Sequence, residues 1–281
     1  MIIGSISEDT KLENRVAITP DILKKYKSLG LEVHLIKNYA THIGIDDEEY
    51  KSQGAQIFQN EEDIILNSNA ILQMGILNDE NLNKLKANQI LVGVLDPYKN
   101  EQKIKELTSK KINCFSLELL PRITRAQSMD ILSSQANLAG YKAVVDSFAY
   151  FQKAVPMMMT AAGTISAAKV LVVGAGVAGL QAIATAKRLG AVVSATDVRS
   201  ATKEQVESLG GKFIMVEDDE ALNAETEGGY AKEMSEEYKK KQAQLISETV
   251  AKQDIVICTA LIPGKKAPVL ITEEMVSSMI P

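Results

Sequence analysis

The chain has 281 residues, of which 46% are hydrophobic and 24% charged, as in a soluble globular protein with one large or two ordinary domains. Its formal net charge of −5 argues against non-specific binding to nucleic acid, which needs a basic surface. Cys114 and Cys258 lie in strand-like apolar runs, so we expect buried free thiols. His34 and His42 have no partner at metal-ligand spacing, so we predict no metal site.

The first half of the chain alternates between strand and helix patterns. Its predicted strands are Ile2–Ile6, Glu32–Ile36, Ala70–Met74, Ile90–Val94 and Asn113–Ser116. Its predicted helices are Pro20–Leu29, Asp46–Gln53, Asn78–Lys86 and Asn100–Ser109. Such alternation indicates a parallel sheet with helices between the strands. Because Met1 leads directly into the first strand, we expect no signal peptide.

A long helix over Ala126–Phe151 is expected to join this half to a second α/β unit. The predicted strands of the second unit are Ala167–Val173, Val192–Thr196, Lys212–Val216 and Asp254–Thr259. The expected fold class is therefore α/β, with two Rossmann-like doubly wound parallel-sheet domains and a cleft between them. We place the N-terminal domain at residues 1–125 and a nucleotide-binding domain at residues 126–281.

Two segments of the second half leave alternatives open or depart from the expected pattern. The polar stretch between Glu217 and Lys252 predicts either a solvated helix with a surface loop or a lid over a nucleotide. The predicted helix Glu273–Met279 runs to the end of the chain, where a doubly wound sheet would continue. We therefore expect the chain to be truncated at its C-terminus.

The most specific local motif is the glycine-rich sequence VLVVGAGVAG at residues 170–179. An apolar strand leads into Gly174, Gly176 and Gly179, a helix follows, and Asp197 ends the next strand. This order favours a dinucleotide, with the pyrophosphate at the helix N-terminus and the adenosine ribose at the carboxylate. The alternative is a glycine-rich turn in some other α/β protein.

The same motif bears on two further predictions. Asp197 favours NAD over NADP because a 2′-phosphate would meet a like charge, and Arg199, which could accommodate that phosphate, is taken as secondary. The uncharged run Val170–Ala186 is at the lower limit for a membrane span. Because its glycines have phosphate-loop spacing, we predict a strand, turn and helix there, and no transmembrane segment.

Several motifs together resemble the alanine dehydrogenase/pyridine nucleotide transhydrogenase family. The N-terminal motif is ENRVAITP, Glu13–Pro20, and the more specific one is PRITRAQSMDILSSQANLAGYKAV, Pro121–Val144. The second half agrees through GAGVAGLQAIATAKRLGA and through the segments at 196–199, 228–238 and 258–268. Within the family, the chain is similar over its whole length to the NAD(H)-binding component of proton-translocating transhydrogenases.

This resemblance implies an activity and partners. The cofactor is NAD(H), and hydride passes directly between NADH and NADP⁺ bound on a partner component. NADP(H) therefore belongs to the partner, and a membrane-spanning subunit couples the transfer to proton movement. The component is expected to be a homodimer, cytoplasmic, and attached to the inner membrane only through its partner subunits.

The resemblance also implies roles for individual residues. Four residues match the segment that holds the nicotinamide and are the candidate catalytic residues: Arg122, Gln127, Asp130 and Ser133. The residues that match the rest of the cofactor site are Gly174, Gly176, Val177, Gly179, Asp197, Val198, Tyr230, Ala260 and Leu261. Without the resemblance, Gln127, Asp130 and Ser133 are better explained as N-cap and first-turn residues of the long helix.

Two other functions compete with this interpretation. From the same resemblance, the substrate site of an alanine dehydrogenase would consist of an Arg near the N-terminus together with a Lys and a His on later strands. Arg15 is present here, but Leu72–Gly75 and Leu95–Pro97 supply neither a Lys nor a His. A deaminating dehydrogenase needs a proton-transfer group and a cationic carboxylate clamp, so these absences argue against that activity. The other alternative is a non-catalytic nucleotide-binding module.

Overall fold

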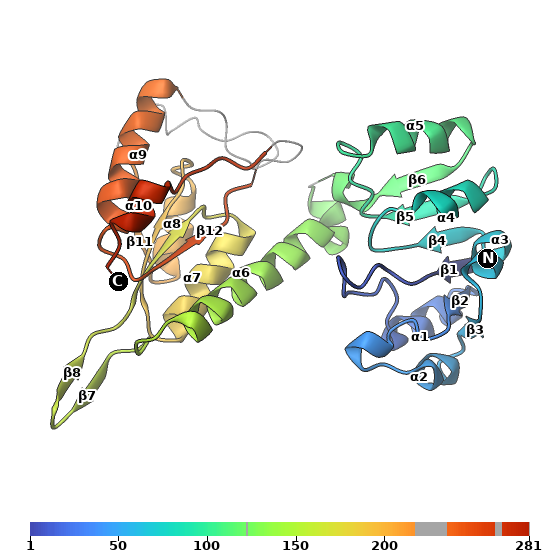
Figure 1. Cartoon of the computed structure of the whole chain (residues 1–281), viewed down its shortest axis with the longest axis horizontal. Coiled ribbons are helices and arrows are strands. Elements are labelled where there is room, and N and C mark those ends of the chain that lie inside the picture. Colours follow the sequence, from blue (N-terminus) through green and yellow to red (C-terminus); the bar gives the residue numbers. More distant parts are fainter. Residues whose placement is uncertain (122, 217–234, 262–265, 281) are drawn as a thin grey trace. The chain divides into compact units, whose positions relative to one another are not determined.

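The computed structural model describes residues 1–121, 123–216, 235–261 and 266–280 (Figure 1). The chain divides into two compact units, Met1–Asp130 and Ile131–Pro281. Across the described part of the chain, every helix is too short or too polar to traverse a lipid bilayer.

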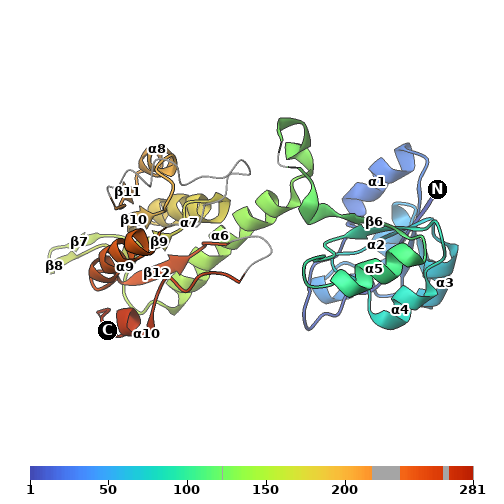
Figure 2. The ribbon, with the colours of Figure 1, turned by 90° about the horizontal axis from the view of Figure 1, so that it is seen from above.

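The first unit contains a six-stranded parallel sheet in the order β3-β2-β1-β4-β5-β6 (Figures 1 and 2). Its strands are β1 (Ile2–Ser5), β2 (Glu32–Ile36), β3 (Gln56–Phe58), β4 (Ala70–Leu72), β5 (Ile90–Gly93) and β6 (Asn113–Ser116). Because β4 lies on the opposite side of β1 from β2, the strand order reverses between β1 and β4. This reversal defines a doubly wound sheet.

Helices connect these strands. They are α1 (Pro20–Ser28), α2 (Asp47–Ser52), α3 (Glu61–Asn67), α4 (Asp79–Lys84) and α5 (Glu101–Ser109), with the short 3₁₀ turn η1 (Thr41–Ile43) after β2. A second short 3₁₀ turn, η2 (Leu117–Leu119), follows β6. Local signals explain several helix starts. The side chains of Asp46 and Asn78 accept the backbone N–H groups of Glu49 and Asn81, which caps α2 and α4. Pro20 occupies the first turn of α1, as its fixed φ favours.

The core of the first unit forms between the sheet and these helices. Leu35, Ile71 and Leu91, on β2, β4 and β5, are fully buried. Tyr50 of α2 is also fully buried and donates its hydroxyl to the carbonyl oxygen of Ile18 at 2.9 Å. This bond satisfies the polar end of a large aromatic side chain inside the core, as burial requires.

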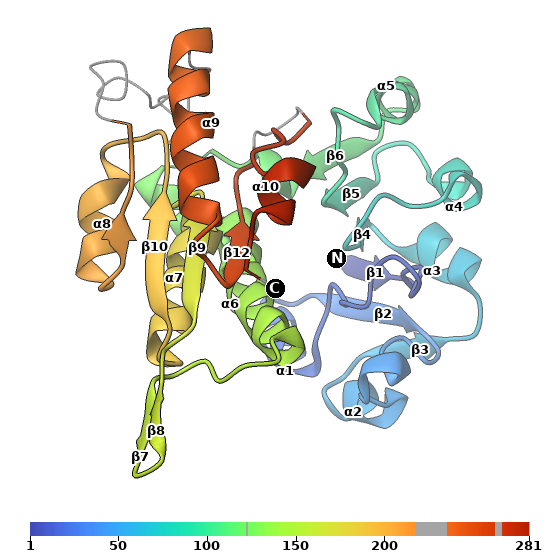
Figure 3. The same ribbon diagram turned by 60° about the vertical axis from the view of Figure 1, so that its left-hand side comes forward.

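The second unit contains a four-stranded parallel sheet in the order β11-β10-β9-β12 (Figure 3). Its strands are β9 (Lys169–Val173), β10 (Val192–Thr196), β11 (Lys212–Phe213) and β12 (Ile255–Cys258). Its helices are α6 (Ile131–Tyr150), α7 (Val177–Arg188), α8 (Thr202–Ser208), α9 (Glu236–Val250) and α10 (Glu273–Ser277). The two parallel sheets and the long helix confirm the predicted α/β fold class.

Alternate residues of β9 point to the two faces of this sheet. Val170 and Val172 pack in a cluster that contains residues of α6 and α7. Leu171 and Val173 pack in a second cluster with residues of α9 and α10. Because a central strand covered on both faces needs apolar residues at every position, β9 appears in the sequence as the continuous run VLVV.

The long helix begins later than predicted. Residues Thr124–Met129 form a separate 3₁₀ helix, η3, and α6 begins at Ile131 rather than Ala126. Asp130 interrupts the pattern with a non-helical backbone, φ −75° and ψ 87°. A short polar side chain at this position favours such a break, because it competes for nearby backbone hydrogen bonds.

An antiparallel hairpin of β7 (Met158–Thr160) and β8 (Gly163–Ile165) was not predicted. It extends away from the parallel sheet of its unit (Figures 1 and 3), and all six strand residues are exposed. Without a buried face, its sequence has no alternation of apolar and polar residues. The periodicity that identifies a half-buried strand is therefore missing from this segment.

The prediction of buried thiols was wrong for Cys258, which is exposed, whereas Cys114 is half-buried. Cys258 is the last residue of β12, and Cys114 lies on β6 at the edge of its sheet, so neither position is fully covered. Both thiols are free, and partial burial raises the pKa of each.

Candidate dinucleotide site

The predicted glycine motif lies at the carboxyl ends of the strands of the second sheet. Gly174 follows β9, Asp197 follows β10, and Thr259 follows β12. Because β10 and β12 flank β9, the strand order reverses between β9 and β12. Ligands of open α/β sheets bind beyond the carboxyl ends of the strands at such a reversal.

Two of the three glycines are required by the protein itself. Gly174 has a φ of +99°, which side chains with a Cβ rarely adopt. A Cβ on Gly179 would lie 1.8 Å from the carbonyl oxygen of Gly174, inside the contact distance of any atom pair. Gly179 therefore allows α7 to pack against the turn that precedes it.

Gly176 differs from the other two glycines. It is the N-cap of α7 and has an ordinary extended backbone, with φ −78° and ψ −168°. A Cβ added there would meet no described atom within 4 Å. Because neither the backbone nor the surrounding described residues need a glycine here, the open space in front of the α7 N–H groups fits the close approach of a ligand phosphate.

Thr259 ties the end of β12 to the glycine turn. Its hydroxyl donates to the carbonyl oxygen of Gly174 at 2.8 Å, and its N–H donates to that of Val173 at 2.8 Å. Ala260 is adjacent, since a Cβ on Gly174 would lie 3.0 Å from its backbone nitrogen. Thr259 was not predicted as a site residue, because its signal in the sequence is a single polar residue after the apolar strand IVIC.

Asp197 is buried beside the same turn. Its carboxylate accepts the N–H of Ala175 at 2.7 Å and that of Arg199 at 2.9 Å. The guanidinium of Arg199 donates to both carboxylate oxygens, at 2.8 and 2.7 Å. Burial alone would raise the pKa of Asp197, but the hydrogen bonds from Arg199 and Ala175 outweigh burial and lower the pKa, so the group is ionised at neutral pH.

Most of the predicted cofactor residues lie at the carboxyl ends of the strands of the second sheet. Val177 is the first residue of α7. Val198 follows Asp197 and packs with the buried ring of Tyr238 of α9. Ala260 and Leu261 continue from Thr259 past the end of β12, and Leu261 is exposed. The predicted residues Arg122 and Tyr230 lie outside the described residues.

The remaining predicted residues lie along the segment that links the two units. Gln127 is an exposed residue of η3, and Asp130 is the last residue of the first unit. Ser133 lies in the first turn of α6, in the second unit. Gln127 is therefore not a capping residue of the long helix, because residues 128–130 lie between it and Ile131.

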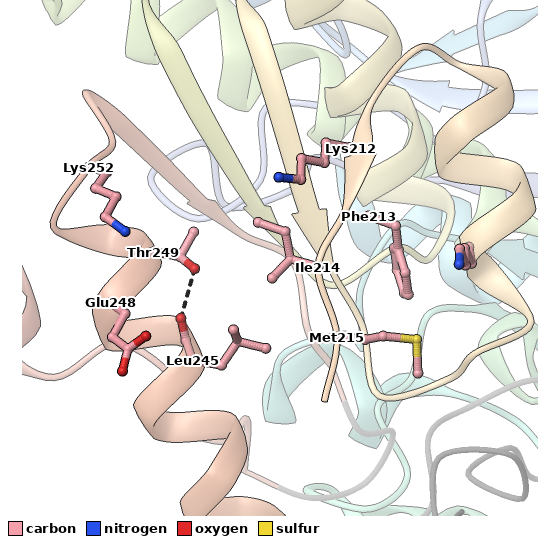
Figure 4. Close-up of a pocket in the computed structure, with 9 residues that line it drawn as sticks. Lys212, Phe213, Ile214, Met215, Leu245, Glu248, Thr249 and Lys252 are labelled. Atoms are coloured by element: carbon pink, nitrogen blue, oxygen red, sulfur yellow. Dashed lines mark hydrogen bonds between the residues drawn. The ribbon is translucent and has the colours of Figure 1, made fainter. Parts of the chain in front are cut away.

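A separate pocket of about 480 Å³ lies between β11 and α9 (Figure 4). Its lining includes three lysines, Lys203, Lys212 and Lys252. The Thr249 hydroxyl donates to the Leu245 carbonyl oxygen at 2.7 Å on the α9 side. None of the residues predicted to bind the cofactor lines this pocket.

Comparison with known proteins defines the class. The chain belongs to the alanine dehydrogenase/PNT family, because the family's N-terminal domain model matches residues 4–139 and its C-terminal domain model matches residues 143–281. The resemblance inferred from the motifs of the sequence is thereby confirmed.

Within this family the chain is more similar to transhydrogenases than to alanine dehydrogenases. It is 53% identical to the first part of NAD(P) transhydrogenase subunit alpha of Rhodospirillum rubrum over 274 residues, 96% of this chain and 71% of that protein. A crystal structure of the transhydrogenase from Sinorhizobium meliloti is 48% identical, covers 100% of this chain and 76% of its own, and superposes with a TM-score of 0.88. The alanine dehydrogenase of Methanococcus maripaludis is only 27% identical over 284 residues, 100% of this chain and 70% of that protein.

Proposed function

We propose that the chain binds NAD(H) as the first component of a proton-translocating NAD(P) transhydrogenase. The single observation that carries this proposal is the open space at Gly176, in front of the α7 N-terminus and beside the ionised Asp197. A glycine that the protein itself does not need is explained by a ligand that approaches the backbone. Membership of the family supports the same ligand class.

Each part of the site has a role in this proposal. The N–H groups at the start of α7 donate to the pyrophosphate and carry the partial positive charge of the helix end. Asp197 accepts the two hydroxyls of the adenosine ribose. Ala260 and Leu261 lie past β12, on the other side of the strand reversal, where they contact the nucleotide.

Asp197 also supports NAD(H) as the nucleotide in preference to NADP(H). Its pKa is lowered, so the carboxylate carries a full negative charge at neutral pH. A phosphate on the ribose would meet the carboxylate as a like charge.

The reaction places few chemical demands on this chain. Bound NADH supplies the hydride, which an NADP⁺ held by the partner component accepts, so no side chain here has to gain or lose a proton. The contribution of the protein is to hold the nicotinamide near attack distance. We assign this to Gln127, Asp130 and Ser133 and, from the family resemblance, to Arg122, and we assign Tyr230 to the adenosine end of the nucleotide.

The proposal includes partners and a location. The related proteins from Rhodospirillum rubrum and Rickettsia prowazekii are named as one part of subunit alpha, which supports assembly with further subunits. We propose an NADP-binding partner and a membrane-spanning partner, and a homodimer of this chain. On this basis the chain is cytoplasmic and attached to the inner membrane through those subunits.

Equilibrium binding of the two nucleotides tests the proposal. The fluorescence of NADH on titration with the protein should give saturable binding, and NADPH should bind far more weakly. Asp197→Asn should weaken NADH binding and reduce the preference over NADPH, because the charge that repels a 2′-phosphate is gone. Equal binding of NADH and NADPH by the unaltered chain would defeat the assignment of Asp197.

A further inference from the structure

The carboxylate of Asp197 has no acceptor position left for a ligand. Each carboxylate oxygen accepts two hydrogen bonds in good geometry. Oδ1 accepts the backbone N–H and the Nε–H of Arg199, at 2.9 and 2.8 Å. Oδ2 accepts the N–H of Ala175 and an Nη2–H of Arg199, both at 2.7 Å. All four positions are therefore filled by the chain itself.

The two kinds of donor differ in how they can move. The N–H groups of Ala175 and Arg199 belong to the backbone just past the ends of β9 and β10, so they hold the carboxylate in place. The guanidinium instead lies at the end of a long side chain, which has other staggered rotamers that leave the backbone in place. The two hydrogen bonds from the guanidinium are therefore the ones that hydrogen bonds from a ligand can replace.

Burial makes this ion pair stronger than a surface pair. The side chains of Arg199 and Asp197 are only 13% and 6% exposed, and the contact is two-pronged. Two-pronged, charge-assisted bonds of this kind are among the strong hydrogen bonds of proteins. A ligand that takes their place has to compete with them, and this competition lowers its affinity.

We propose that Arg199 is an internal occupant of the ribose site, whose guanidinium has to leave Asp197 before the two ribose hydroxyls of NAD(H) can donate to it. The inference rests on the proposed function and adds to it the residue that sets the affinity. The Nε–H and Nη2–H groups stand in for the two hydroxyl donors of the ribose. Binding is therefore an exchange of donors, in which Asp197 never remains without partners.

This exchange has a consequence for the function. A subunit that delivers hydride in every turnover has to release its oxidised nucleotide as readily as it binds the reduced one. An internal competitor for the ribose site weakens both nucleotides equally, because they share the adenosine half. Arg199 thus favours rapid exchange over tight binding.

The test compares the dissociation constant of NADH, from fluorescence titration, for the unaltered full chain and two variants. Arg199→Met keeps most of the aliphatic stem and removes the donors, so the dissociation constant should fall about tenfold, which corresponds to about 1.4 kcal/mol. Arg199→Lys retains one charged donor group without the two-pronged geometry and should lie between the two. The exposed Arg188, in the last turn of α7, supplies the control Arg188→Ala, which removes the same charge and should leave binding unchanged.

The outcomes separate the inference from the proposed function. Absence of NADH binding in the unaltered chain defeats the proposed function. Binding in the unaltered chain, with equal or weaker binding in Arg199→Met, overturns the inference alone. If Arg199→Met does not fold, Arg199→Lys decides, since a dissociation constant equal to or above that of the unaltered chain also overturns it.

Discussion

The substitution Gly176→Ala separates the binding of a nucleotide from the stability of the fold. The φ of −78° suits alanine, and the added Cβ would meet no described atom within 4 Å. Replacing a glycine by alanine raises the free energy of unfolding by about 0.4–1 kcal/mol, because it lowers the conformational entropy of the unfolded chain. Alanine is, however, a poorer N-cap than glycine by a similar amount. The two effects offset each other, so we expect a free energy of unfolding within about 0.5 kcal/mol of the unaltered value.

Nucleotide binding should respond quite differently. The Cβ would occupy the space in front of the first N–H groups of α7, where the pyrophosphate is proposed to lie. Loss of two charge-assisted hydrogen bonds, each worth about 1.5 kcal/mol, amounts to about 3 kcal/mol. The dissociation constant for NADH should therefore rise roughly 150-fold.

Urea unfolding and NADH fluorescence titration on the same samples measure the two quantities. Gly75→Ala is the matched control, because Gly75 lies in the first unit and a Cβ there would touch only the side chain of Glu8, at 3.9 Å. This control should leave NADH binding unchanged. If Gly176→Ala binds NADH with unaltered affinity, the open space at Gly176 is not a phosphate site.

Two further predictions concern stability. Gly179→Ala should lower the free energy of unfolding, measured in urea, by on the order of 3 kcal/mol. The added Cβ would lie 1.8 Å from the Gly174 carbonyl oxygen, so the backbone has to shift. An unchanged urea midpoint would contradict the packing role of Gly179. Burial lowers the pKa of His34, which packs on Phe58 with 4.6 Å between ring centroids and has no hydrogen-bond partner for either ring nitrogen among the described atoms. As pH falls below about 6.5, the unfolded chain takes up a proton that the folded chain resists, so stability is lost on acidification. His34→Leu should therefore lose less stability than the unaltered chain when the pH is lowered from about 7.5 to about 5.5, a range that spans the ordinary histidine pKa. Equal losses of stability in the two proteins would contradict this role of His34.

Several strands were predicted accurately from the sequence. The observed bounds of β2, β6 and β10 equal the predicted ones, and the predicted strand before the glycines contains β9. β2, β9 and β10 are rich in β-branched and other apolar residues, so their local pattern agrees with their burial. β6 is half polar and has no buried residue, as its place at the edge of the sheet allows. Elements whose formation depends on their surroundings were missed or misplaced. The short strand β3 and the short helix α3 were not predicted.

In the candidate site too, the residues of the local motif were predicted, whereas the contacts that depend on the folded structure were not. The glycine motif and Asp197 have fixed spacings in the sequence, because each belongs to one local strand–turn–helix unit. The bond from Thr259 to Gly174 joins residues 85 positions apart, and no local pattern encodes it. The position of Arg199 was visible in the sequence, but its two-pronged contact with Asp197 depends on the turn geometry after β10.

Transfer of a labelled hydride measures whether the chain delivers hydride from NADH to a nucleotide on a partner protein. NADH carrying deuterium at the transferred C4 position is mixed with the chain and with an NADP-binding transhydrogenase component loaded with NADP⁺, and the NADPH formed is analysed by mass spectrometry. We expect NADPH that carries one deuterium from NADH, and only when both proteins are present. Saturable NADH binding with no labelled NADPH, or oxidation of NADH by pyruvate and ammonium without the partner, would contradict it.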